Sequence, residues 1–372
     1  MKVETKLIHE GQHIDPATGS VTAPIHLSTT FERQADGSYP LGYEYSRGGN
    51  PNRNALEANL AALEGGADAM AFSSGSVAMM SVLQALKAGD HVIAPEEIYF
   101  GVRVMLQDIF APWGLEVSFV DMNDLGKVAD AMQANTRLLI IESPSNPQLS
   151  VADLEGLAKL AHNQAAYLIC DNTIPTPILQ RPIEWGVDLV VHATTKYVGG
   201  HSDVLGGALI TSADTEFWQR IKHIQKIGGA VPSPFECWLT TRGLQTLSYR
   251  VKAMSAHALE LAKFLETHPK IEQVLYPGLP SHPQHALAQK QMDAYGGLIS
   301  ILVKGGEEAA IGVAAKVKVF TRATSFGGTH SLIEHRASVE AEGSKTPRNL
   351  LRLSIGLEHF DDLKADLEQA LS

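Results

Sequence analysis

Short runs of apolar residues alternate, up to about residue 211, with segments whose apolar residues recur every three or four positions. Apolar runs bounded by turn residues are typical of buried strands, and the longer spacing is typical of amphipathic helices. The runs that predict strands are ADAMAF, HVIA, EVSFVD, RLLIIE, AYLICD, GVDLVVH and GALIT. Their alternation with helical segments predicts an α/β fold, with a mainly parallel sheet flanked by helices on both faces.

The ends of the pattern differ from its middle. Residues 1–48 are rich in Gly, Pro and Ser without sustained periodicity, which predicts an irregular N-terminal arm that needs a surface to lie on. A helix is predicted from Pro51, because Leu56, Leu60 and Leu63 share one face and Gly65 follows. We predict a large domain over 49–246.

Beyond about residue 243 the rhythm changes. A helical pattern over about 244–267 is followed by the apolar runs GLISILV, VKVF and LLRLSIG and by an acidic helix that begins near Asp361. We therefore predict a smaller α+β C-terminal domain over 247–372.

Composition narrows the class of protein. The 372 residues are 44% hydrophobic and 19% charged, as in a globular chain, and the net charge of -11 argues against a nucleic-acid or membrane surface. Cys170 and Cys237 are far apart, which fits a reducing compartment without a disulfide framework. The N-terminus lacks the apolar core of a signal peptide, and no apolar run is long enough to span a membrane, so we expect a cytoplasmic protein.

The candidate chemistry is concentrated in VHATTKYVGGHSD, residues Val191 to Asp203. Lys196 follows the carboxyl end of a predicted strand, the edge where ligands bind in open α/β sheets. A partly desolvated lysine there can lose its proton and form a Schiff base with a carbonyl cofactor. Taken alone, the stretch fits a solvated turn lysine better, because turn glycines beside a strand are common.

Other polar residues follow predicted strands. Ser74, Gly75 and Ser76 lie between a strand and a helix N-terminus, a place that suits a phosphate or a plain helix cap. Asp171 closes AYLICD, where it is either a turn residue or a carboxylate that keeps a pyridine nitrogen protonated. Tyr99 follows another predicted strand, where it could stack on an aromatic cofactor ring or simply pack in the core. Lys196 lies 25 positions after Asp171, at what could be the end of a neighbouring strand, and this favours the role of Asp171 as a cofactor-binding carboxylate.

Several segments together resemble one family. YEYSRGGNP, SSGSVAM, ESPSNP, ICDNTIPTP, HATTKYVGGHSD, AVPSPFECWLTTRGL and LLRLSIGLE look like the trans-sulfuration enzymes of Cys/Met metabolism, which depend on pyridoxal 5'-phosphate. The resemblance runs from about Thr5 to Leu371, in the family's order. It implies a fold-type-I pyridoxal phosphate enzyme of the aspartate aminotransferase kind.

The resemblance also implies roles for individual residues. Lys196 would form the Schiff base and shuttle protons, Asp171 would pair with the pyridine nitrogen, and Tyr99 would stack on the ring and donate a proton. The residues implied to hold the phosphate are Gly75, Ser76 and Thr195, with Tyr45 and Arg47 from a neighbouring subunit of a homotetramer built from dimers. The residues implied to bind the substrate are Asn146, Ser325 and Arg352, the last as a bidentate partner of the α-carboxylate.

The implied reaction is elimination or replacement at the γ-carbon of an L-amino acid, as in cystathionine γ-lyase and γ-synthase of methionine and cysteine metabolism. Two alternatives stay open. One is a γ-lyase for an oxygen-linked substrate such as an O-acylhomoserine or canavanine, and the other is a C-S lyase like cystathionine β-lyase. A pyridoxal phosphate binder without catalysis is a further class, which the set of Lys196, Asp171, Tyr99 and Arg352 disfavours.

The chain departs from the family's usual pattern near the substrate. His330 stands where relatives that handle cystathionine usually carry glutamate, Val104 where many have arginine, and Ala193 where a serine often binds the phosphate. Phe100 replaces a common glycine, and Gly101 lies where methionine γ-lyases carry a cysteine. HRASVEAEGSKTP replaces the more usual HPASMTH. The histidine pairs 282/285 and 330/335 lack further ligands, so no metal site is expected.

Overall fold

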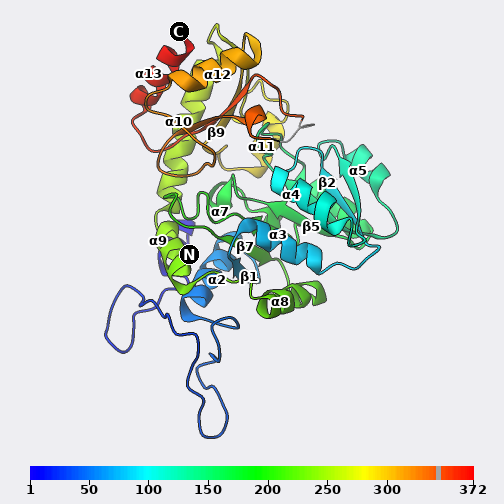
Figure 1. Ribbon diagram of the computed structural model, residues 1–372, viewed down its shortest axis with the longest axis vertical. Helices are drawn as coiled ribbons and strands as arrows, with labels where there is room; N and C mark the ends of the chain where they lie inside the picture. Colours follow the sequence, from blue (N-terminus) through cyan, green and yellow to red (C-terminus); the bar gives the residue numbers. More distant parts are fainter. Residues whose placement is uncertain (341–344) are drawn as a thin grey trace.

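The computed structural model describes residues 1–340 and 345–372. Two β-sheets lie one above the other in Figure 1, and the helix α10 (Leu247–Glu266) runs beside both. The larger sheet occupies the middle of the view, the smaller sheet lies above it near the C-terminus, and the N-terminal arm extends below. The sequence therefore forms a large and a small layered unit joined by one long helix.

The larger sheet has seven strands in the order β1-β7-β6-β5-β4-β2-β3. The strands from β6 to β3 run parallel to one another, whereas β7 is antiparallel to both β6 and β1. Their bounds are β1 Asp68–Phe72, β2 His91–Pro95, β3 Glu116–Val120, β4 Thr136–Glu142, β5 Tyr167–Asp171, β6 Leu189–His192 and β7 Gly207–Thr211. The predicted α/β class and mainly parallel sheet are confirmed.

Helices cover both faces of this sheet because its strands are apolar on both sides. In β4, Leu138 and Ile140 pack into one core cluster, and Leu139 and Ile141 pack into the other. The first cluster includes residues of α3 (Gly75–Gln84), α4 (Phe100–Val104), the π-helix η1 (Met105–Phe110) and α8 (Glu216–Gly228). The second includes residues of α2 (Pro51–Glu64), α6 (Leu154–Asn163), α7 (Thr176–Leu179), α9 (Pro234–Leu244) and α10.

The ends of α2 follow from its sequence. The Asn50 side chain accepts the N–H of Asn52 at 3.0 Å, and Pro51 occupies the first helical position, where a missing N–H costs nothing. The helix ends at Gly65, which adopts φ +73°, a left-handed conformation that glycine takes without steric penalty. The predicted start and stop of this helix are confirmed.

The smaller sheet has five strands in the order β10-β11-β12-β9-β8 and is antiparallel except between β10 and β11. Its strands are β8 Ile271–Leu275, β9 Leu298–Val303, β10 Thr321–Arg322, β11 Leu332–His335 and β12 Leu350–Ser354. The C-terminal half of α10 packs on it together with α12 (Gly306–Lys316) and α13 (Phe360–Leu371). The remaining short helices are α5 Leu125–Ala131, η2 Pro182–Trp185, α11 His285–Gln291 and η3 Arg336–Ser338.

One apolar run of the C-terminal part does not form a strand. The run VKVF, residues 317–320, lies outside any strand, although all of its residues are described. The carboxylate of Asp366 accepts the N–H groups of Lys318, Val319 and Phe320 at 2.8–2.9 Å. These N–H groups therefore bond to a side chain of α13 instead of a neighbouring strand.

The N-terminal arm is irregular, as predicted. After the short helix α1 (Val3–His9), residues 10–50 contain only an isolated bridge between Thr30 and Tyr45. In Figure 1 the arm forms long loops that leave the body of the molecule. Its apolar side chains include Val21, Leu27 and Leu41, which are 83%, 70% and 85% exposed.

Candidate active site

A cavity of about 210 Å³ opens at the carboxyl ends of the parallel strands. Glu142 at the end of β4 lies opposite Asp171 at the end of β5, and Asp171 lies opposite Val191 of β6. The cavity brings together nine of the predicted residues, namely Gly75, Ser76, Tyr99, Asn146, Asp171, Thr195, Lys196, Ser325 and Arg352. We call it the inner cavity.

Lys196 lies in the turn that follows β6. The N–H of Gly200 donates to the Lys196 carbonyl at 2.8 Å, and Arg250 of α10 donates to the Tyr197 carbonyl at 2.8 Å. A Cβ on Gly200 would lie 2.1 Å from the Arg250 guanidinium, so this glycine lets the arginine pack against the turn. The backbone that carries Lys196 is thus fixed by a buried side chain of α10.

The Lys196 amine lies where it can lose its proton easily. Its Nζ donates to Ser325 Oγ at 2.9 Å and lies 5.0 Å from the centre of the Phe326 ring. Shielding from water, and then the nearby charge of Arg352, lowers the pKa of Lys196 to about 8. A larger fraction of this amine is therefore neutral near pH 8 than for an ordinary lysine.

Two carboxyl groups lie side by side on the floor of the cavity. Shielding from water raises the pKa of Asp171 above its ordinary value, although the side chain and N–H of Thr173 oppose this by hydrogen bonding. Shielding, and then the charge of Asp171, raises the pKa of Glu142 far more. Glu142 also accepts the N–H of Tyr99 at 3.0 Å. Burial thus favours the protonated form of both carboxyl groups, and the charge of Asp171 adds to this effect on Glu142.

The N-terminus of α3 closes the opposite wall. The Ser74 hydroxyl caps the helix by accepting the N–H of Val77 at 3.2 Å. The N–H groups of the first helical turn, which include those of Gly75 and Ser76, have no acceptor within the helix. A Cβ on Gly207 would lie 2.3 Å from the Ser74 carbonyl oxygen, so β7 can approach this turn only with glycine there. The arrangement suits an anion.

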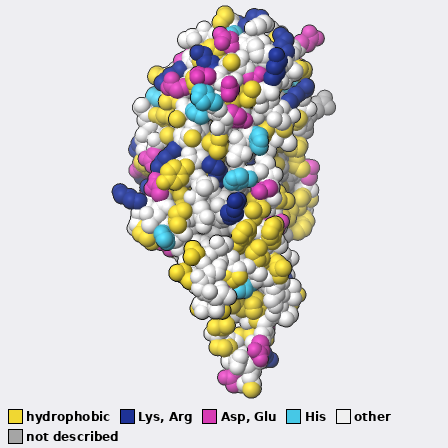
Figure 2. All heavy atoms as spheres, turned by 90° about the vertical axis from the view of Figure 1, so that its left-hand side faces the viewer, with side chains coloured by type: hydrophobic (Ala, Val, Ile, Leu, Met, Phe, Trp, Pro, Cys, Tyr) yellow, Lys and Arg dark blue, Asp and Glu magenta, His cyan; other side chains and the backbone are white. Residues whose placement is uncertain are grey.

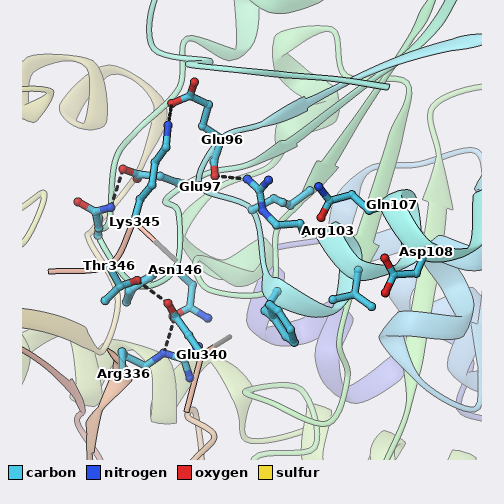
Figure 3. Close-up of a pocket in the computed structure, with 15 residues that line it drawn as sticks. Glu96, Glu97, Arg103, Gln107, Asp108, Asn146, Arg336, Glu340, Lys345 and Thr346 are labelled. Carbon is cyan, nitrogen blue, oxygen red and sulfur yellow. Dashed lines mark hydrogen bonds and ion pairs between the residues drawn. The ribbon is translucent and has the colours of Figure 1, made fainter. Parts of the chain in front are cut away.

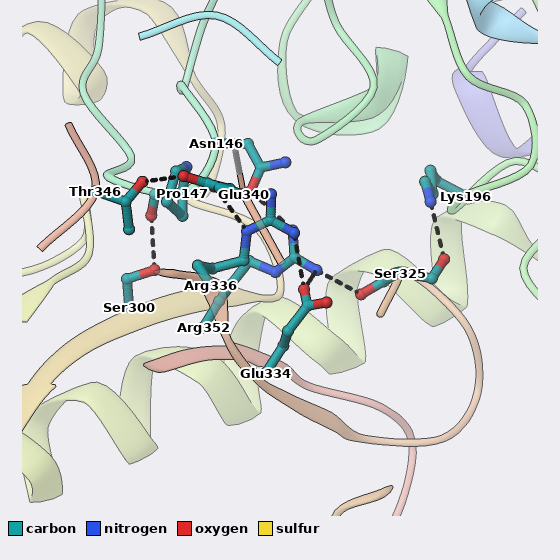
Figure 4. Close-up of polar contacts among 10 residues, drawn as sticks. All are labelled: Asn146, Pro147, Lys196, Ser300, Ser325, Glu334, Arg336, Glu340, Thr346 and Arg352. Atoms are coloured by element: carbon teal, nitrogen blue, oxygen red, sulfur yellow. Dashed lines mark hydrogen bonds and ion pairs between the residues drawn. The ribbon is translucent and has the colours of Figure 1, made fainter. Parts of the chain in front are cut away.

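Arg352 projects from β12 of the smaller sheet and is 3% exposed. Its guanidinium donates to Asn146 Oδ1 at 2.9 Å and to the Ser325 carbonyl at 3.0 Å, and it pairs with Glu334 at 2.6 Å (Figure 4). Shielding from water, and then the charge of Arg336, lowers the pKa of Arg352 to about 10. Ser325 itself adopts φ +92°, a conformation that L-residues rarely take outside constrained sites. Two sheets therefore meet at Ser325.

A second cavity of about 470 Å³ adjoins the first, and Asn146 and Arg336 line both. Figure 3 shows it enclosed by side chains of both charges. Lys345 pairs with Glu96 at 2.6 Å, and Arg103 donates to the Glu96 carbonyl. The charged residues in its wall are Glu96, Glu97, Arg103, Asp108, Arg336, Glu340 and Lys345. We call it the outer cavity.

Two predicted residues lie elsewhere in this chain. Arg47 donates to the Lys226 carbonyl at 2.7 Å, and Tyr45 is 47% exposed on the arm. Neither lines the inner cavity of the described chain. Their expected place in a neighbouring subunit stays a prediction.

Three of the departures from the family pattern line the two cavities. Phe100 and Val104 line the outer cavity and Ala193 lines the inner one. His330 is exposed and lines neither, whereas Thr324 lines the inner cavity directly before Ser325. Residues 341–344 of HRASVEAEGSKTP lie outside the described residues.

Sequence reasoning missed four residues of this site: Glu142, Thr324, Glu334 and Arg336. Glu142 had a signal, because it closes the run RLLIIE as Asp171 closes AYLICD. The contact between Glu334 and Arg352 depends on the pairing of β11 with β12. The sequence of β11, LIEH, is too short for its pattern to predict a strand.

Two negative results hold for residues 1–340 and 345–372. No group of three or more His, Cys, Asp or Glu side chains there could hold a metal ion. No helix in that part of the chain is long and apolar enough to cross a membrane.

Comparison with known proteins agrees with this geometry. Residues 4–372 match the model of a family described as Cys/Met metabolism PLP-dependent enzyme. A cystathionine gamma-synthase of Mycobacterium tuberculosis is 46% identical over 99% of this chain and 96% of its own, and a cystathionine gamma-lyase of Dictyostelium discoideum is 43% identical over 100% and 97%. The crystal structure of metB from Corynebacterium glutamicum has a TM-score of 0.97 at 43% identity, covering 100% of this chain and 98% of that one.

The inner cavity fits the cofactor of that family. Pyridoxal phosphate has an aldehyde, a basic ring nitrogen and a phosphate, and the cavity offers Lys196, Asp171 and the N-terminal turn of α3 as partners for these. A Cβ on Gly75 would lie 3.0 Å from the Cβ of Ala193, so glycine keeps this cradle open.

Proposed function

This chain belongs to the pyridoxal-phosphate-dependent enzymes of Cys/Met metabolism, and on that premise we propose that it catalyses replacement or elimination at the γ-carbon of an L-amino acid. The observation that carries the proposal is the contact between the Lys196 amine and Ser325, whose carbonyl accepts from Arg352. The proposal takes Lys196 as the base and Arg352 as the receptor for an α-carboxylate, and their shared neighbour Ser325 supports these two roles. The relatives named gamma-synthase and gamma-lyase support the γ-carbon as the position that reacts.

We assign the base to Lys196. When bound, pyridoxal phosphate supplies an electron sink that acidifies the bonds at the α-carbon. Lys196, with its pKa lowered to about 8, removes the α-proton and carries protons between neighbouring atoms of the substrate. Ser325 Oγ, 2.9 Å from the amine, holds it in place between these transfers. Loss of a β-proton next allows the γ-substituent to leave.

The two neighbouring carboxyl groups, Asp171 and Glu142, are proposed to differ in charge. We propose that Asp171 is ionised against the protonated ring nitrogen of the cofactor, since a cation beside it offsets the cost of its shielding. Glu142 stays neutral and fixes the backbone of Tyr99. Tyr99, 45% exposed above the cavity, is thereby placed to stack on the ring and to donate a proton to the leaving group.

The anionic groups have separate partners. We propose that the first turn of α3, with Gly75 and Ser76, binds the cofactor phosphate together with Thr195. Arg352 binds the substrate α-carboxylate, and Asn146, which accepts from one arm of the guanidinium, sets its orientation.

The assembly we propose is a homotetramer made of two dimers. Exposed apolar side chains gather on the lower half of the face in Figure 2, over the arm and the nearby helices. The exposed apolar residues of the arm, α9 and α10 include Val21, Leu27, Leu41, Phe235 and Tyr249. Monomers rarely expose so much apolar surface, and a neighbouring subunit would cover it. In that arrangement Tyr45 and Arg47 reach the phosphate of the neighbour, and sedimentation of the holoenzyme would give its mass.

The test of the function is a panel of L-amino acids with sulfur-linked and oxygen-linked γ-substituents, each offered with and without cysteine. We expect 2-oxobutanoate without the thiol, or a thioether product with it. Pyruvate from cystathionine without 2-oxobutanoate would contradict the assignment to the γ-carbon and favour a β-lyase. A preference for an O-acylhomoserine or canavanine over thioethers would favour the oxygen-linked alternative.

A further inference from the structure

Arg336 lies in the wall that the inner and outer cavities share. It is the first residue of η3, directly after β11, and is 8% exposed. A charged side chain so far from water requires partners of opposite charge. The carboxylates that pair with Arg336 therefore indicate its role.

Two guanidinium groups share one carboxylate oxygen. Glu334 Oε2 accepts from Arg352 at 2.6 Å and from Arg336 at 2.9 Å. Glu340 Oε1 accepts from Nε and Nη2 of Arg336 at 3.1 Å and 2.9 Å. Figure 4 shows the two guanidinium groups and the Glu334 carboxylate close together, with Ser325 on the side toward Lys196.

The charges of this cluster balance. Arg336 and Arg352 carry two positive charges, and Glu334 and Glu340 carry two negative ones. Without the Arg336 charge, Glu334 would pair with Arg352 alone, and the cluster would present one excess negative charge to an approaching carboxylate. Such an excess repels an anion strongly where shielding lowers the effective dielectric constant.

We propose that Arg336 is a positioning residue that shares Glu334 with Arg352 and so leaves the charge of Arg352 available to the substrate α-carboxylate. The proposal rests on the function proposed above, because it takes Arg352 as the carboxylate receptor. It assigns Arg336 no contact with the substrate. Its effect is electrostatic and is transmitted through Glu334.

The same cluster acts on the base. The charged groups that act on the pKa of Lys196 include Asp171 from β5, Glu334 from β11, Arg352 from β12 and Arg336 from η3, and Glu142 of β4 lies beside Asp171. Of these, Arg352 and Arg336 lower the pKa of Lys196, whereas Glu334 and Asp171 raise it. Removal of the Arg336 charge should therefore make the Lys196 nitrogen hold its proton to higher pH.

The experiment uses holoenzyme and L-norvaline, an α-amino acid without a γ-leaving group, whose binding is read from the absorbance of the bound cofactor. Arg336→Met keeps a long apolar stem and removes the charge. We expect this variant to raise the Kd for L-norvaline at least about tenfold. L-norvalinamide, which lacks the carboxylate, should bind within about twofold of its affinity for the unaltered protein. Equal weakening of both ligands would overturn the proposal, because it would indicate a purely structural role.

Glu340→Gln is the matched variant for Arg336→Met, because it removes a negative charge from the same cluster. It leaves one excess positive charge, so L-norvaline should bind as tightly as before or tighter. The double variant Arg336→Met/Glu340→Gln is balanced again and should return to within about threefold of the unaltered affinity. A double variant as weak as Arg336→Met would contradict the charge-balance argument. Lys345→Met, which removes an exposed cation of the outer cavity, should change the affinity by less than about twofold.

A pH titration of the cofactor absorbance without any ligand separates this proposal from the proposed function. Arg336→Met should move the transition of the Lys196 nitrogen to higher pH, and Glu340→Gln should move it to lower pH. If these shifts appear while no γ-substituted amino acid is turned over, the proposed function fails and the charge balance stands. If turnover is normal and neither variant shifts the transition, the charge balance fails.

Discussion

The two adjoining cavities differ in how they hold their charges. In the inner cavity each charged group is shielded from water and fixed by neighbours, as Lys196 is by Ser325 and Arg352 is by Asn146 and Glu334. In the outer cavity the pair Lys345–Glu96 leaves side chains 64% and 42% exposed. A shielded charge has large effects on its neighbours, whereas an exposed pair contributes little. We therefore expect the inner cavity to set the chemistry and the outer cavity to tune the substrate.

The strongest test of this contrast is Lys196→Ala. The variant lacks both the amine that binds the cofactor and the proposed base, so turnover should fall about 10³-fold or more. The visible absorbance of the Schiff base should disappear with it. Surviving turnover would refute the assignment of the base.

Asp171→Asn and Glu142→Gln compare two neighbours on the same floor. Asn cannot carry the charge that the ring nitrogen requires, so kcat should fall about 100-fold or more. Burial raises the pKa of Glu142 well above its ordinary value, which favours the neutral form, and Gln keeps an acceptor for the Tyr99 N–H, so kcat of Glu142→Gln should stay within about threefold of the unaltered value. Similar losses in both variants, measured as kcat with saturating cofactor, would show that the two carboxyl groups are not divided in this way.

The lowered pKa of Lys196 predicts how the cofactor-free protein takes up pyridoxal phosphate. Only the neutral amine attacks an aldehyde, so the rate of reconstitution should rise about tenfold per pH unit below pH 8 and level off above it. Stopped-flow absorbance measures this rate. A rate that kept rising to about pH 10 would indicate an ordinary lysine.

The smallest effect is expected in the outer cavity. Glu96→Gln breaks an exposed ion pair, whose contribution is up to about 1 kcal/mol, so KM should change less than about fivefold. Cofactor affinity and kcat should not change. A large loss of kcat would mean that the outer wall takes part in the chemistry after all.

The sequence predicted the large sheet well because its strands are buried on both faces and read as continuous apolar runs. Lys196, Asp171 and the turn at Gly75 were found as candidates because each follows such a run. The roles of Arg352 and Asn146 came from resemblance. The Arg336–Glu334–Arg352 contacts could not be predicted, since they join a strand of only four residues to its neighbour and a short helix. The domain limits near residues 48 and 246 remain a prediction.

The contact of Lys196 with Ser325 joins the two sheets at the reacting atom. Lys196 follows β6 of the larger sheet, whereas Arg352 belongs to β12 of the smaller one. The distance between the Lys196 amine and the Arg352 guanidinium thus depends on how the two sheets pack together, and α10 packs in the cores of both. A misplacement of about 1 Å can reduce a rate about 100-fold. Core substitutions in α10, far from the cofactor, should therefore change turnover as well as the melting temperature, and a search for altered specificity could begin there.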